Sequence, residues 1–253
     1  GKSHAGVGSD LNLLAGSSDF ETGGRFQVFT GSGRASSGGV IIKTSNGANT
    51  AGSSGGITIA TGSANHRSGI IEISSGAASE NAGDVMIAGG TSGQGFGSSI
   101  LLEAGDSEHL TGGIVSILSG SSSFSSSGSV AINTGFTNDQ GSSGDISLST
   151  GKSRASSSGS ISIATGSGFS SGTISIKAGD GFEGNGGGIR IFGGSSSQNR
   201  GGEVRISSGL SETNDSGDIG INSGSDKEGF KSGGIDIHTG LSGLKSGDIN
   251  LNT

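Results

Sequence analysis

The chain has 253 residues, a formal net charge of −7 and no Cys, Pro, Trp or Tyr. Its basic residues are scattered singly, which disfavours nucleic acid or an anionic membrane surface as a partner. Without Cys there are no disulfides or thiolate metal sites, and no apolar run reaches the roughly 20 residues of a membrane span, so we expect no membrane insertion. The 56 glycines and the hydrophobic content of 28% are typical of a disordered linker. The absence of Pro argues against that interpretation, because Pro is excluded from continuous backbone ladders.

One short pattern, Gly-x-Ile-x-Ile, recurs along the whole chain at steps of 13 to 17 residues. The pattern has two apolar positions in each of 17 units, and all 34 hold Ile, Val, Leu or Phe. Such regularity indicates a repeat protein, so we treat residues 1–253 as a single array without separate domains. The units start at Leu11, Phe26, Val40, Ile57, Ile71, Val85, Ile100, Val115, Val130, Ile146, Ile161, Ile174, Ile189, Val204, Ile219, Ile235 and Ile249.

The alternation of apolar and polar residues predicts one short half-buried strand in each unit, and no helical periodicity is present. We therefore expect an all-β fold, a parallel β-solenoid (β-helix) of 17 units of about 15 residues. Connections of about eight residues disfavour an antiparallel meander. Two units per coil would let the apolar faces pack against each other, whereas a coil of one unit would have little to bury. The core ladder is expected at Ile57, Ile59, Ile146, Leu148, Ile161, Ile163, Ile174, Ile176, Ile189, Ile191, Ile219 and Ile221.

Glycine borders each predicted strand, and we expect it to turn the corners through positive φ. In two places such glycines imitate a catalytic or nucleotide-binding motif. Residues 179–184 match G-x-G-x-x-G and residues 168–172 match G-x-S-x-G. Both motifs need a helix directly afterwards, and none is expected here. We therefore expect no catalytic residue and no cofactor.

Acidic and histidine side chains do not form a recognisable metal-binding pattern. Asp precedes the first apolar residue of five units, but other residues interrupt that column, unlike in calcium-binding nonapeptide repeats. The four histidines fall in different units at different phases, so we expect solvated side chains and no metal. These residues are Asp10, Asp84, Asp145, Asp218, Asp248, His4, His66, His109 and His238.

Several apolar residues lie outside the predicted core. Seven Phe fall in connections, where they either plug open corners or anchor a neighbouring molecule: Phe20, Phe96, Phe124, Phe136, Phe169, Phe182 and Phe230. Candidate self-contacts are the polar-face residues Leu14, Phe29, Leu118 and Phe192, and Ile249 and Leu251 of the last unit. Asn214 begins the one Asn-x-Ser/Thr glycosylation sequon.

The unit, which reads SGDISLSTG, SGSISIATG or SGDIGINSG, resembles the Ser/Gly-rich tandem arrays of predicted surface and extracellular proteins of diatoms and other algae. The resemblance covers all 17 units but concerns a compositional style of repeat without a catalytic signature. It implies a secreted scaffold, such as a cell-surface fibre, a wall component or a flagellar hair.

The sequence thus predicts a non-catalytic structural protein that forms a stiff extracellular or cell-surface rod or filament. An ice-binding or adhesive β-solenoid module is the alternative, although residues such as Glu72 and Arg190 would interrupt a flat ice-binding face. The last strand, at Ile249–Leu251, has regular phase and no cap. We therefore expect other copies of the chain, or further repeats of the same array, to continue the ladder beyond Thr253.

Overall fold

A computed structural model describes residues 6–47, 52–138, 141–225, 229–243 and 245–252. These residues form neither a helix nor a strand. They therefore contain no helix that could cross a membrane. The chain divides into two parts, Gly1–Val130 and Ala131–Thr253. The boundary falls inside a sequence repeat, between Val130 and the next apolar residue, Ile132.

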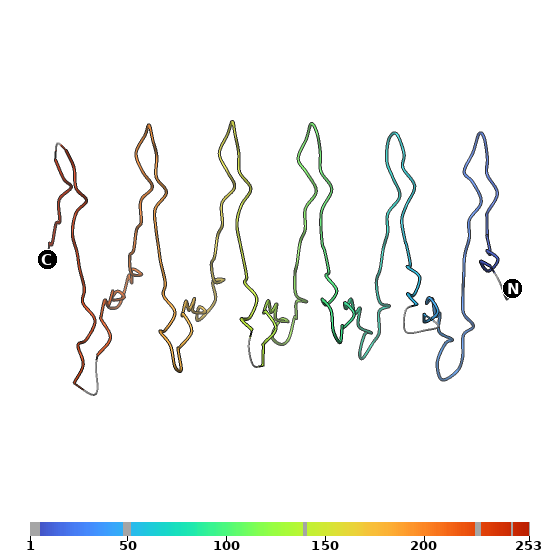
Figure 1. The fold of residues 1–253 in the computed structure, drawn as a ribbon, viewed down its shortest axis with the longest axis horizontal. Coiled ribbons are helices and arrows are strands. Elements are labelled where there is room, and N and C mark those ends of the chain that lie inside the picture. The colour runs from blue at the N-terminus through green and yellow to red at the C-terminus, as the bar shows by residue number, and fades with distance from the viewer. Residues whose placement is uncertain (1–5, 48–51, 139–140, 226–228, 244, 253) are drawn as a thin grey trace. The chain divides into compact units, whose positions relative to one another are not determined.

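Within both parts of the chain, extended segments alternate with loops (Figure 1). Uninterrupted runs such as 22–33, 96–107, 157–167 and 185–196 contain no turn or bend, and each includes one apolar pair of the sequence pattern. Short bends separate the runs, for example at 108–110, 154–156 and 197–199. Local conformation therefore follows the sequence period, with extended backbone around each apolar pair and bends in the Ser/Gly-rich connections.

The predicted all-β, parallel β-solenoid fold is wrong for this chain. A solenoid requires each extended segment to hydrogen bond to a counterpart about 4.8 Å away. Nine backbone hydrogen bonds between described residues instead join partners only seven to nine positions apart, across single loops. The apolar period predicts an extended backbone with one apolar side, but it does not require one chain to stack its own segments.

The predicted core, in which the apolar faces of the two units of a coil would pack against each other, does not form either, because no described residue is buried. Most described residues are exposed, and the few that are partly sheltered are Thr44, Ala104, Ala178, Ser211 and Thr239. Corners formed by glycines with positive φ are likewise largely missing. Among the described residues only Gly229 has positive φ, at 91°. At some of the other described glycines, such as Gly181, a Cβ would collide with nearby backbone, whereas at others, such as Gly194, it would meet open space.

Candidate functional site

The apolar pair is the feature that every unit presents. Its first side chain is 49–63% exposed in 16 units, and Leu11 is more exposed. The second side chain is more open, at 62–76% in the units from Val28 to Ile237. The twelve side chains proposed for the core ladder lie between 49% and 72% exposed. Each unit therefore has an apolar side that is partly exposed to solvent and that no part of the described chain covers.

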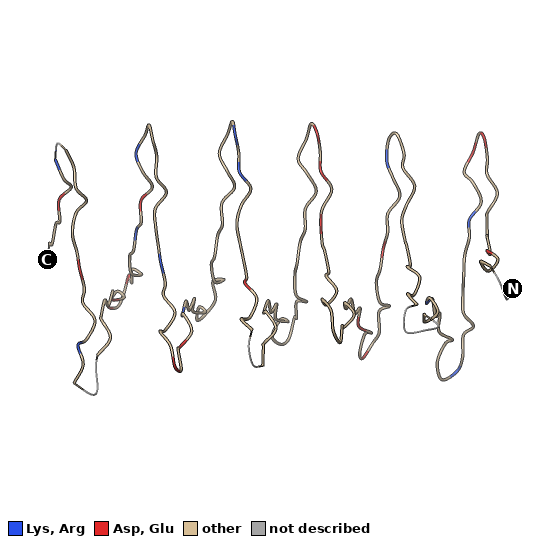
Figure 2. Ribbon diagram, in the orientation of Figure 1, with Lys and Arg blue, Asp and Glu red and all other residues tan. Residues whose placement is uncertain are grey.

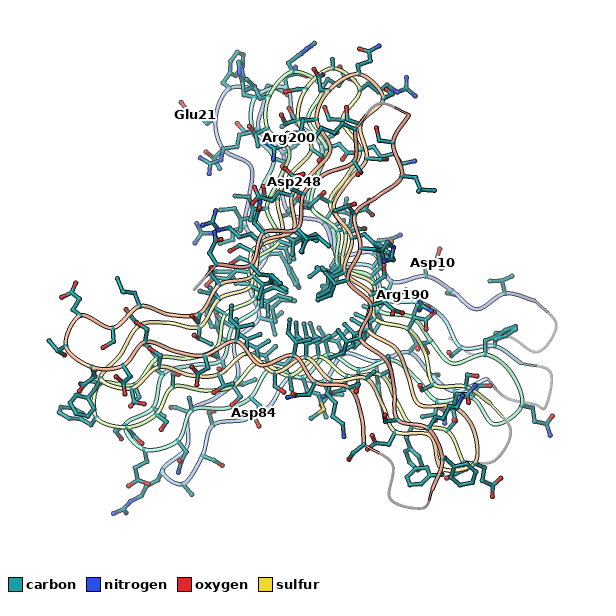
Figure 3. All side chains as sticks on the ribbon, turned by 90° about the vertical axis from the view of Figure 1, so that its left-hand side faces the viewer. Asp10, Glu21, Asp84, Arg190, Arg200 and Asp248 are labelled. Atoms are coloured by element: carbon teal, nitrogen blue, oxygen red, sulfur yellow. The ribbon has the colours of Figure 1, made fainter. Side chains whose placement is uncertain are left out.

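Side chains on the opposite side of each segment are more exposed to solvent than those of the apolar pair. Arg190 and Asp84 point away from the aliphatic side chains of their segments (Figure 3). Apolar residues on this side are at least 79% exposed, as at Ile41 and Met86. The predicted self-contact residues Phe29, Phe192, Leu14 and Leu118 are 81–89% exposed, while Ile249 and Leu251 are 52% and 90% exposed. The structure brings none of them together within the described chain.

A backbone hydrogen bond closes the base of many loops. The last glycine of one extended segment accepts through its carbonyl oxygen, and the residue that begins the next segment donates its N–H. The donor–acceptor pairs are Gly24–Gly16, Gly38–Gly31, Ser98–Gly90, Gly113–Gly105, Gly128–Gly120, Gly187–Gly179, Gly202–Gly194, Gly217–Gly209 and Gly233–Gly224, at 2.7–3.3 Å. We call these the loop-closing bonds. Where Ser98 replaces glycine, its Oγ also donates to the Gly90 carbonyl oxygen at 2.9 Å.

A serine two positions after the first glycine of a loop organises its bend. The Oγ of this serine accepts the N–H of the residue three positions later, as in a Ser/Thr turn. The accepting serines are Ser18, Ser92, Ser107, Ser122, Ser153, Ser196 and Ser211, with distances of 2.8–3.1 Å. This role of serine was not predicted from the sequence. The available signal was Gly-x-Ser at the start of the connections, such as Gly120-Ser121-Ser122.

The loops also expose aromatic side chains. The seven connection Phe residues are at least 80% exposed, so they do not plug corners within the described chain. Phe124 and Phe169 are fully open to solvent. Phe20 lies within the bend at 19–21, and Phe182 lies within the bend at 182–184. The side chains of Phe20, Phe96, Phe124, Phe136, Phe169 and Phe182 are therefore exposed to solvent in their loops.

Charged side chains are scattered along both parts of the chain (Figure 2). In the described part of the chain, no group of three or more His, Asp or Glu side chains could hold a metal ion, and no pocket is found. His4 lies outside the described residues. Lys177 Nζ and Asp180 Oδ2 form an ion pair at 2.9 Å, and both side chains are largely exposed. Such a surface pair contributes little to stability.

The matches to G-x-G-x-x-G at residues 179–184 and to G-x-S-x-G at residues 168–172 lie in loops. No helix follows either of them among the described residues. A Cβ at Gly181 would collide with the Gly184 carbonyl oxygen, so glycine is needed there for a close turn of the loop itself. Ser170 of the G-x-S-x-G match lies in the bend at 168–170.

Asn214 is exposed at the end of the bend 212–214. Its N–H donates to Ser211 Oγ at 3.0 Å, and Ser216 Oγ accepts the Ser211 N–H at 3.2 Å. Both the asparagine and the serine of the sequon therefore belong to one ordered loop. The Asn214 side chain is open to solvent there.

The repeated apolar side and the loop-closing bonds are thus the main features from which function can be argued. Comparison of the chain with protein-family models, curated proteins and solved structures finds no match.

Proposed function

We propose that this protein is a non-catalytic structural protein that associates into a stiff extracellular rod or filament. Its partners would be other copies of the chain or further repeats of the same array. The observation that carries this proposal is the exposed apolar pair, which recurs in all 17 units and has nearly the same exposure in the 15 units between the first and the last. Exposed apolar surface that continues over a whole molecule is typical of an association surface.

The distribution of chemical groups supports a scaffold rather than an enzyme. Catalysis needs an acid, a base or a nucleophile held together beside a bound substrate. Here the titratable side chains of the described residues are dispersed and no pocket gathers them. The proposed location outside the cell or at its surface draws on the resemblance to Ser/Gly-rich algal surface arrays. The exposed loop position of Asn214 is compatible with that location.

Electron microscopy of the purified chain over a range of concentrations tests this proposal. We expect thin, uniform filaments to appear as the concentration rises. Discrete monomers at every concentration would overturn the proposal. If those monomers inhibited ice recrystallisation, the ice-binding alternative would replace it.

A further inference from the structure

The extended segments leave their backbone polar groups without partners. The N–H and C=O groups of residues 160–165 make no hydrogen bond within the described chain, and the same holds for residues 188–193, which lie between two loop-closing bonds. Backbone groups are strong donors and acceptors, and an extended backbone presents them along two opposite edges. Each segment can therefore accept a partner strand on both edges.

The accessible surface of the chain is far larger than that of a folded monomer. It measures 26160 Å² for 24.2 kDa. A compact monomer of this mass exposes about 10,000 Å² and a fully unfolded chain about 35,000 Å². The excess over the compact value is about 16,000 Å², or about ten protein–protein interfaces of standard size. Without buried apolar surface, nothing offsets the entropy of ordering an isolated chain in this conformation.

The chemistry of the segments favours another copy of the same chain as the partner. A copy offers the same apolar pair at the same steps of 13 to 17 residues, so all its segments can be matched at once, whereas an unrelated strand could match only one. The residue between the two apolar positions is uncharged in 13 of the 17 units. At that middle position, copies placed in the same register would put like charges opposite each other in four units, those of Glu72, Arg190, Arg205 and Asp236. The Asp that precedes the apolar pair in five other units would also face its own copy.

We infer that copies of this chain associate side by side, each extended segment pairing through its backbone with segments of other copies at both edges. The spacing between paired segments would be about 4.8 Å. Pairing would cover the half-exposed apolar side and satisfy the backbone groups left open in the single chain. The loops, nine of which have a loop-closing bond of their own, would stay outside the paired region. This inference rests on the proposed self-association and specifies its geometry, which is lateral rather than end to end.

Amide hydrogen exchange on the assembled protein tests this geometry. We expect the segment amides, such as those of residues 160–165, to become protected in every unit on assembly and to lose protection on dissociation. The amides of the bend at 154–156 are expected to stay comparatively unprotected. Protection confined to the first and last units would overturn lateral pairing while leaving the filament proposal intact. Failure to assemble at all would overturn both.

A pair of proline variants gives a second, independent test. Ser162→Pro removes an N–H donor from the middle of an extended segment, whereas Ala155→Pro places the same ring in the preceding bend at 154–156. Since one lost backbone hydrogen bond contributes about 1 kcal/mol, we expect the critical concentration for assembly to rise about fivefold for Ser162→Pro and little for Ala155→Pro. Equal effects of the two substitutions would contradict backbone pairing along the segments.

Discussion

The amide of Gly202 donates a 2.8 Å hydrogen bond to the carbonyl oxygen of Gly194, and a Cβ at residue 202 would lie 2.9 Å from the Gly194 nitrogen. The same bond joins Gly187 to Gly179 at 3.0 Å. At residue 202 glycine is favoured because the two chain segments approach too closely for a side chain, whereas Ser98 is accommodated at the donor position of another loop. These bonds set the base of nine loops and hence the start of the extended segments that follow them.

Gly202→Ala should therefore lower the stability of the assembled protein, because the added methyl group would push the base of the loop apart. We expect a loss of about 1–3 kcal/mol in the free energy of unfolding, measured by denaturant melting of the assembled protein. Gly194→Ala is the matched control, since no atom lies within 4 Å of a Cβ at that position. The control should be neutral or slightly stabilising, because alanine restricts the unfolded chain. Equal losses for the two variants would contradict the close approach.

The serine bends can be tested at Ser196, whose Oγ accepts the Asn199 N–H at 2.9 Å. Ser196→Ala removes this acceptor, so we expect the Asn199 amide to exchange faster by NMR. Because the loop is exposed, the cost in stability should be about 0.5–1 kcal/mol. Ser197→Ala, in the same loop, should leave the Asn199 amide unchanged. An Asn199 exchange rate that does not respond to Ser196→Ala would refute the role of the bond.

The two sides of an extended segment should respond differently to a charge. Ile163→Asp places a carboxylate on the apolar side of its segment, which association is proposed to bury, whereas Ser162→Asp places one on the opposite side. We expect Ile163→Asp to abolish filaments or to lower their thermal stability strongly. Ser162→Asp should be nearly neutral. Similar melting shifts for the two variants would show that the apolar side is not the association surface.

Asn214 should accept a glycan when the chain is expressed through a secretory pathway, because its side chain is exposed in a loop. Mass spectrometry should detect the glycan in the native sequence and in Ser216→Thr, and should find none in Ser216→Ala. Filaments should still form, since the loop lies outside the proposed paired region. An unmodified Asn214 in the secreted native chain would contradict this accessibility.

The local features of the chain could be predicted from the sequence because they depend on near neighbours. The apolar period predicts no helix, and the described residues contain none; it also places extended backbone around pairs such as Ile161 and Ile163. The connections between the pairs contain the bends, as at 154–156. Alternation of side chains along an extended chain needs no tertiary contact, so a single sequence is enough to locate it.

The β-solenoid could not be inferred safely, because a period in sequence does not specify which segment pairs with which. Ile161 offers the same face to a neighbour from its own chain or from another copy, and the described residues show no pairing within one chain. The role of Ser196 escaped the sequence analysis for a different reason. Serine is so common in the connections that its fixed position two residues after glycine did not stand out.

The central claim is that this chain acquires its regular structure by associating with copies of itself. Sedimentation velocity and far-ultraviolet circular dichroism, recorded on the same samples over a wide concentration range, test it most directly. We predict a dilute monomer without a strand signal, and a strand signal that grows in step with the sedimenting assembly. A monomer that keeps a full strand signal at the lowest concentration, or that never associates, would contradict the account.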